Sequence, residues 1–195
     1  AKFEAFGAQA RLLLRVSFRG KGVVSDLSRK FGCDLGAVPW LLTEAARIGV
    51  PVIGLSFHVG SQSPDPEAHV AAIEACRPFF ESDTLAGTAR LHVLDIGGGF
   101  PAAYNKHVRP VGDLARVINA EIGRLFAPEI QILAEPGRFL VATAATSIAR
   151  VIGKAVRDGK RCYYIDDSVY HTFSGIIFDH CQYPLKALKR GKTEV

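Results

Sequence analysis

Three stretches of the sequence end a run of apolar residues with glycine and a polar or charged side chain. They are residues 56–61 (Ser-Phe-His-Val-Gly-Ser), 95–100 (Asp-Ile-Gly-Gly-Gly-Phe) and 134–138 (Ala-Glu-Pro-Gly-Arg). Such an ending is typical of a buried parallel strand whose carboxyl end opens into a ligand site. Because parallel strands present these ends at one edge, the sequence predicts that the three stretches meet at a single site.

The residue types at this predicted site favour an anionic ligand. The triplet 97–99 offers backbone N–H groups that approach an anion without steric cost, and Arg138 adds positive charge, so phosphate is the predicted ligand. Glu135 and His58 then remain for chemistry. From residue type alone, Glu135 is either a structural partner of an arginine or a functional carboxylate. A lone histidine on an apolar strand, such as His58, is usually a satisfied core residue.

The elements that would position these residues alternate in type along the chain. Apolar periodicity predicts strands at 12–16, 30–34, 52–59, 91–96 and 130–134, and helices at 23–31, at 40–48, from Pro66 with Asp65 as its cap, and along a stripe of Leu114, Ile118, Ile122 and Leu125. Five strands separated by helices indicate a parallel sheet or a barrel, and spacing leaves both open. We assign His69, on the third helix, to the surface.

Beyond Arg138 the pattern changes to that of an antiparallel structure. A helical turn is predicted at 139–145, and strands at 147–156 and 161–165 flank Asp158-Gly159, a two-residue hairpin signal. The predicted domain division therefore separates residues 1–145 from residues 146–195.

Length and composition limit the class of protein. A chain of 195 residues with 48% hydrophobic and 22% charged residues is typical of a globular core. It lacks methionine and begins Ala-Lys-Phe-Glu, so we interpret it as an internal fragment. With no apolar run of ~18 residues and no leader pattern, we expect a cytoplasmic protein without a membrane partner. The net charge of +5 lies largely in the last ten residues and indicates a solvated face, not a nucleic-acid partner.

No metal site or disulfide is predicted. The four cysteines, Cys33, Cys76, Cys162 and Cys181, form no C-x-x-C pair, which indicates reduced and mostly buried thiols. Asp166 and Asp167 are adjacent, but neighbours on a strand point to opposite faces, so they do not converge on a metal ion.

Taken together, these motifs resemble the pyridoxal-phosphate decarboxylases of basic amino acids, the ornithine and lysine decarboxylases built on the alanine-racemase-type barrel. Residues 163–170 (Tyr-Tyr-Ile-Asp-Asp-Ser-Val-Tyr) and the segment from Phe173 to His180 also look like that family, and the resemblance runs from about Leu12 to Tyr183. It implies an α/β fold with the later strands of a (β/α)8 TIM-type barrel, followed by the start of a β-rich C-terminal domain.

The resemblance also implies the cofactor, pyridoxal 5′-phosphate, and residue roles. Glu135 matches a carboxylate that keeps the ring nitrogen protonated, so that the ring accepts the electrons released with CO2, and His58 matches a residue against the ring face. The implied cofactor-binding residues are His58, Ser61, Gly98, Gly99, Glu135, Pro136, Gly137 and Arg138. The implied substrate-binding residues are Phe178 and Asp179, the latter for the distal amino group. Arg15 near the ring and Tyr170 near the substrate have equally simple interpretations, a strand-end charge and a core residue.

The implied reaction converts ornithine to putrescine, or lysine to cadaverine, with release of CO2 for polyamine synthesis by a homodimer. The family's Schiff-base lysine would lie upstream of Ala1, and its catalytic cysteine and phosphate-binding tyrosine beyond Val195. The chain alone is therefore expected to be inactive, and Cys181 does not substitute. The His-Val-Gly-Ser sequence and the context of Asp179 favour this branch over diaminopimelate and arginine decarboxylases.

Two other functions remain open at this point. A non-catalytic relative could keep the fold and bind a regulatory partner, although retention of Glu135 argues against it. A barrel enzyme that binds a sugar phosphate would use the same glycines and Arg138 without pyridoxal. The choice between ornithine and lysine is not determined by these residues.

Overall fold

A computed structural model describes residues 6, 9–18, 30–81, 90–104, 107–178 and 181–188. The chain forms two compact units. The first contains the described residues up to 103 and from 107 to 144, and the second contains Tyr104 and the described residues from 145 onward. The predicted site lies in the first unit.

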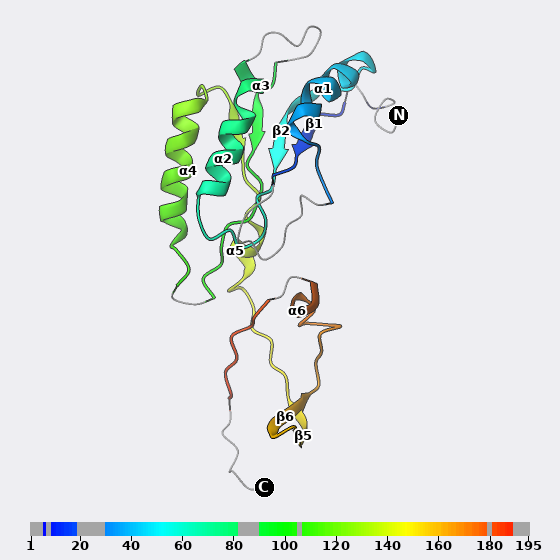
Figure 1. Cartoon of the computed structure of the whole chain (residues 1–195), viewed down its shortest axis with the longest axis vertical. Coiled ribbons are helices and arrows are strands. Elements are labelled where there is room, and N and C mark those ends of the chain that lie inside the picture. The colour runs from blue at the N-terminus through cyan, green and yellow to red at the C-terminus, as the bar shows by residue number, and fades with distance from the viewer. Residues whose placement is uncertain are drawn as a thin grey trace. The chain divides into compact units, whose positions relative to one another are not determined.

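A four-stranded parallel sheet forms the centre of the first unit (Figure 1). Its strands are β1 (Leu12–Val16), β2 (Val52–Phe57), β3 (Val93–Asp95) and β4 (Gln131–Leu133), in the order β1-β2-β3-β4. Helices lie between successive strands from β1 to β4. The predicted parallel α/β architecture is therefore confirmed, and the carboxyl ends of all four strands lie along one edge of the sheet.

Strand register gives the sheet an apolar face and a mixed face. Leu55 pairs with Leu94, and both are fully buried. One residue further along, Arg15, Ser56 and Asp95 occupy matching positions on three neighbouring strands. Because successive side chains of a strand point to opposite faces, this second row lies on the face opposite Leu55 and Leu94.

Helices cover the apolar face of the sheet. The remaining elements of the first unit are η3 (Leu35–Ala37), α1 (Val38–Arg47), α2 (Glu67–Cys76), α3 (Pro78–Glu81), α4 (Val111–Leu125) and α5 (Gly137–Val141). The α4 side chains Leu114 and Ile118 are buried, as the predicted stripe requires. Each buried side chain of this size contributes about 1.5–3 kcal/mol, so apolar packing holds α4 in place.

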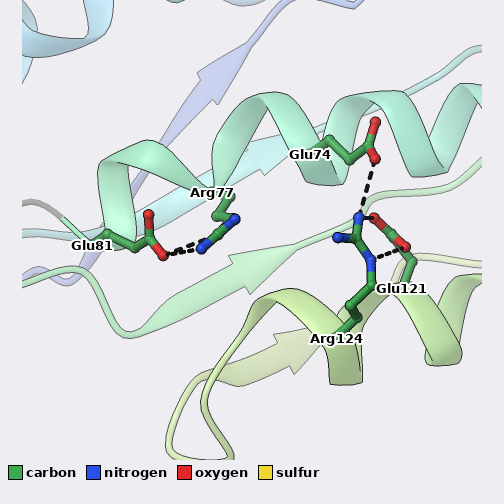
Figure 2. Close-up of polar contacts among 5 residues, drawn as sticks. All are labelled: Glu74, Arg77, Glu81, Glu121 and Arg124. Carbon is green, nitrogen blue, oxygen red and sulfur yellow. Dashed lines mark hydrogen bonds and ion pairs between the residues drawn. The ribbon is translucent and has the colours of Figure 1, made fainter.

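Exposed ion pairs connect α2, α3 and α4 on their outer surface (Figure 2). Arg124 on α4 contacts Glu121 one turn earlier and Glu74 on α2, with an N–O distance of 3.2 Å to Glu74. Arg77, next to α2, pairs with Glu81 at the end of α3. These charges are solvated, so they add little stability and mainly favour one alignment of α2 against α4.

The strand predicted at 30–34 is wrong. Only Cys33 pairs with the sheet, as an isolated parallel bridge to Val16. Gly32 has a φ of +93°, and a Cβ there would lie 2.8 Å from the Ser17 hydroxyl oxygen. The chain turns too sharply at this point to continue as a strand, so the described part of the first unit has four strands and not five.

Two helix predictions have different outcomes. The helix at 40–48 is confirmed as α1, whereas most of the helix predicted at 23–31 lies outside the described residues. The N-cap of α2 is Pro66 and has no side-chain cap, so Asp65 does not cap this helix. Asp65 instead forms an exposed ion pair with Arg109, with an N–O distance of 3.4 Å.

The second unit contains the predicted hairpin. Strands β5 (Val151–Arg157) and β6 (Lys160–Ile165) pair antiparallel. Asp158 and Gly159 both have positive φ, +50° and +71°, as a type I′ turn requires, so the hairpin signal is confirmed. A short helix, α6 (Gly175–Phe178), follows.

The expectation that the cysteines are mostly buried is wrong. Only Cys76 is buried, and this burial raises the pKa of its thiol to about 12, whereas Cys33, Cys162 and Cys181 are partly exposed. The described residues contain no group of three histidine, cysteine or acidic side chains placed to hold a metal ion. Within the same residues, no helix has both the length and the apolar character that crossing a membrane requires.

Candidate functional site at the carboxyl edge of the sheet

The three predicted stretches meet around Gly98. His58 directly follows β2, the glycine triplet begins two residues after β3, and Glu135 follows β4 by two residues. A Cβ at Gly98 would lie 2.7 Å from the Glu135 carbonyl oxygen and 3.0 Å from His58 Nε2. Only glycine fits there, so its absent side chain allows the ends of three strands to approach one another.

Every carbonyl of the glycine triplet 97–99 accepts a hydrogen bond from a different part of the first unit. The first accepts the Glu135 N–H at 2.8 Å, and the third accepts the Ser63 N–H, also at 2.8 Å. The second accepts from Nε2 of His69 on α2, at 3.2 Å. All three carbonyl oxygens are therefore directed into the protein.

The N–H groups of the same loop are arranged differently. Gly97 N–H donates to Asp95 Oδ1 at 2.8 Å. For the N–H groups of Gly98 and Gly99 the described residues provide no acceptor. Since C=O and N–H of one peptide point in opposite directions, carbonyls held inside leave these N–H groups turned outward. Consecutive outward N–H groups form an anion-binding concavity, and a phosphate group fits this loop.

His58 is a neutral imidazole with a defined tautomer. Its Nδ1 accepts the Gly60 N–H at 3.0 Å, so the ring proton resides on Nε2. Burial lowers the pKa of His58 below its usual value, and the nearby positive charge of Arg15 lowers it further. The ring at the edge of Gly98 is therefore uncharged near neutral pH.

Arg15 brings a partly desolvated positive charge to the face of the sheet that carries Ser56 and Asp95. Its guanidinium carbon lies 5.3 Å from the centre of the Phe31 ring. Its Nη2 atom is buried and has no hydrogen-bond partner among the described residues. A buried donor without a partner is costly, so the geometry favours an anionic group nearby.

The remaining predicted cofactor residues of the first unit lie along the same edge. Ser61 is half-buried, three residues after His58. Pro136 precedes α5, Gly137 begins it, and Arg138 lies half-buried within it. Their roles stay predictions.

The expectation that Glu135 ends a buried strand is wrong. Its side chain is exposed, and β4 shows an exposed, half-buried, exposed pattern. The cause is the position of β4 as the last strand in the sheet order, paired only with β3. The Glu135 N–H still donates to the Gly97 carbonyl oxygen, and this bond holds the Glu135 backbone at the site.

Substrate residues predicted from the resemblance fall in the second unit or outside the described chain. Phe178 ends α6 and is 76% exposed. Asp179 lies outside the described residues. Tyr170 is 90% exposed, so its interpretation as a core residue is wrong.

His69 is the main residue that the sequence interpretation missed, because its assignment to the surface is wrong. It is 0% exposed and lies 5.0 Å, centroid to centroid, from the Phe100 ring. The missed signal is helical spacing, since His69 precedes the buried Ala72, Ile73 and Cys76 by three, four and seven residues.

We predict that His69 makes the fold sensitive to acid. Burial lowers its pKa from the usual 6.5 to about 4, with the hydrogen bond to Gly98 opposing this shift and His58 adding to it. Between pH 6.5 and pH 4, the imidazole of His69 is therefore protonated in the unfolded chain but neutral in the folded chain. Stability is full above pH 6.5 and falls by on the order of 3 kcal/mol as the pH falls towards 4.

Urea denaturation at several pH values measures this effect. His69→Gln should flatten the pH dependence of the unfolding free energy between pH 6.5 and 4. His92→Gln, at an exposed histidine of the same unit, controls for removal of an imidazole. Equal slopes for the wild type and His69→Gln would contradict the prediction.

Comparison with known proteins gives consistent matches. A family model described as "Pyridoxal-dependent decarboxylase, pyridoxal binding domain" matches residues 1–142. The lysine/ornithine decarboxylase of Selenomonas ruminantium is 36% identical over 186 residues, which cover 95% of this chain and 47% of that protein. Antizyme inhibitor 2 of Xenopus laevis is 37% identical, over 88% of this chain and 40% of that protein.

A solved structure agrees with these matches. The crystal structure of lysine/ornithine decarboxylase complexed with cadaverine from Vibrio vulnificus has a TM-score of 0.85 and 40% identity, over 97% of this chain and 48% of that chain. The match confirms the expected fold class, an α/β chain that forms part of a barrel. This chain spans less than half the length of these relatives.

Proposed function

The chain belongs to the pyridoxal-dependent decarboxylase family, whose pyridoxal-binding domain matches residues 1–142, and on this basis we propose that it is part of a decarboxylase of ornithine or lysine. The observation that carries the proposal is the meeting of His58, Glu135 and the outward N–H groups of the glycine loop around Gly98. This arrangement provides an anion site, a flat neutral side chain and a carboxylate at one edge of the sheet.

The cofactor that this site would hold is pyridoxal 5′-phosphate. The N–H groups of Gly98 and Gly99 would donate to its phosphate, and the guanidinium of Arg138 is suited to bidentate contact with the same oxygens. Ser61, Pro136 and Gly137 line the same edge. The lack of an acceptor for the two glycine N–H groups within the described residues supports this fit.

Glu135 and His58 would have separate roles at the ring of the cofactor. Pyridoxal phosphate, when bound, supplies an electron-accepting ring for the loss of an α-carboxylate as CO2. Glu135 would hold a proton at the ring nitrogen, because a carboxylate beside that atom favours its charged form. His58, neutral with its proton on Nε2, would pack on the ring without adding a competing positive charge.

We also propose which residues contact the substrate, which products form and how the protein assembles. Phe178 and Asp179 would contact the substrate, with the Asp179 carboxylate pairing with the distal ammonium of a diamino acid. The products would be putrescine or cadaverine for polyamine synthesis, made by a cytoplasmic homodimer. The similar enzyme from Vibrio vulnificus forms a complex with cadaverine, which supports a diamine product.

A non-catalytic role is the second candidate. The similarity to antizyme inhibitor 2 of Xenopus laevis favours it, since that relative is not named as an enzyme. Such a protein would bind a regulatory partner through the same fold and would not need an electron-accepting cofactor. Cofactor binding and CO2 release separate the two candidates.

We expect the protein that carries this sequence to take up pyridoxal phosphate and to release CO2 from ornithine or lysine. Borohydride reduction with the cofactor, followed by peptide mapping, should label a single lysine. Labelled CO2 release should be measured with ornithine, lysine, diaminopimelate and arginine in parallel. Folded protein that gains no label and releases no CO2 would contradict the decarboxylase and favour the non-catalytic relative.

A further inference from the structure

One hydrogen bond in the glycine loop differs in kind from its two neighbours. The carbonyls of Gly97 and Gly99 are held by backbone N–H groups, which every residue except proline supplies. The carbonyl of Gly98 is held by the side chain of His69. Of the three carbonyl bonds, only this one depends on the identity of one residue, and that residue lies on α2, outside the three strand-end stretches.

The peptide that His69 holds lies between two glycines, so its backbone has little steric restraint on rotation. It joins Gly98 to Gly99, and Gly99 has a φ of +103°, so no Cβ on either side restrains the peptide plane. Rotation of this plane by half a turn would exchange the Gly99 N–H for the Gly98 carbonyl oxygen on the outward side. An oxygen in that position would repel a phosphate, whereas the N–H attracts it.

Among the described residues, the surroundings of His69 give its ring a single hydrogen-bond partner, the Gly98 carbonyl. The acceptor at 3.2 Å is a carbonyl, so Nε2 must carry the proton. The other nitrogen, Nδ1, is buried and has no hydrogen-bond partner within the described chain. The rings of Phe57 and Phe100 lie 6.4 Å and 5.0 Å away, centroid to centroid. The imidazole is therefore fixed by apolar packing, with its only donor aimed at Gly98.

We propose that His69 is a positioning residue for phosphate binding: by holding the Gly98 carbonyl inside, it keeps the Gly99 N–H directed at the anion site. This inference rests on the proposed function, because it assigns the anion to the cofactor phosphate. His69 itself does not contact the cofactor. Its effect passes through one peptide unit of the glycine loop.

The test compares pyridoxal phosphate with pyridoxal, which lacks the phosphate. The dissociation constant of pyridoxal is divided by that of pyridoxal phosphate, both measured by absorbance titration of the protein. This ratio reports the contribution of the phosphate alone. His69→Phe keeps an aromatic ring but removes the donor, and His69→Gln restores an N–H donor at a similar reach. Cys76→Ala, on the same buried face of α2, is the control for loss of packing.

The expected result is that His69→Phe lowers this ratio by about tenfold, because an outward donor to an anion is lost. His69→Gln should recover most of the ratio, and Cys76→Ala should leave it unchanged. An unchanged ratio in His69→Phe, or an equal loss in Cys76→Ala, would overturn the inference. A wild type that binds both compounds equally would overturn the proposed function as well, so the two failures are distinguishable.

A measurement on the wild type decides the matter if His69→Phe does not fold. Nitrogen NMR of labelled histidine should show a proton on Nε2 of His69. Its signal should shift on addition of pyridoxal phosphate and much less with pyridoxal. A proton on Nδ1, or equal shifts with both compounds, would overturn the inference.

Discussion

Replacement of Gly97 by alanine is expected to destabilise the first unit by about 4 kcal/mol or more, a loss found only for severe substitutions. Gly97 has a φ of +65°, and a Cβ there would lie 1.9 Å from the Phe57 carbonyl oxygen. That oxygen belongs to the backbone at the end of β2, so no side-chain rotation relieves the clash. Relief requires β2 and β3 to separate at the edge that carries the site.

Urea denaturation of the variant and the wild type measures this loss. Gly123→Ala is the matched control, since Gly123 is exposed within α4 and a Cβ there meets nothing within 4 Å. Alanine should raise stability at that position by about 0.5–1 kcal/mol, because glycine is a poor helix former. Gly97→Ala within about 1 kcal/mol of the wild type would show that the strand ends do not pack as described.

Glu135→Gln is expected to lower kcat for decarboxylation by on the order of 100-fold or more, while cofactor affinity changes much less. Glutamine keeps the size of the side chain but cannot hold a proton at the ring nitrogen. The ring would then be a poorer acceptor for the electrons released with CO2. Phosphate binding should persist, because the contacts proposed for the phosphate are made by Gly98, Gly99 and Arg138 and not by Glu135.

The measurement is CO2 release at saturating ornithine or lysine, with cofactor binding followed by absorbance in the same samples. Glu129→Gln is the matched control, since Glu129 is exposed and lies just before β4. It should behave as the wild type. Activity of Glu135→Gln within a few-fold of the wild type would remove Glu135 from the proposed role and leave the carboxylate with a structural function.

Short-range patterns predicted most of the elements in the described chain. Alternating strand and helix periods predicted the parallel α/β fold. The Asp158-Gly159 pair predicted a hairpin, and both residues have the positive φ angles that its turn requires. Both signals depend on residues within one element or one turn, where local backbone preference decides the outcome. The strand predicted at 30–34 failed because Gly32 turns the chain and Cys33 forms only a single bridge.

Burial was predicted less well than secondary structure, because it depends on neighbours distant in the sequence. Glu135 was expected at the end of a buried strand, but β4 is the last strand of the sheet order and its residues are not buried. His69 was assigned to the surface from its residue type, but α2 turns it onto the glycine loop. Asp95 received no role, yet its carboxylate holds the Gly97 N–H.

The amino-acid sequence was sufficient to predict that three strand ends meet at one edge of the sheet, because glycine with histidine, glutamate or arginine after an apolar run is a local pattern tied to strand ends. The arrangement within the site came only from the folded chain. Which carbonyls of the glycine loop point inward and which N–H groups point outward is set by hydrogen bonds between separate elements. The bond from His69 to Gly98 spans 29 residues of sequence, and the bond from Gln62 to Ala102, beside the loop, spans 40. Such bonds form only once the sheet and α2 have packed, so no short-range pattern encodes them.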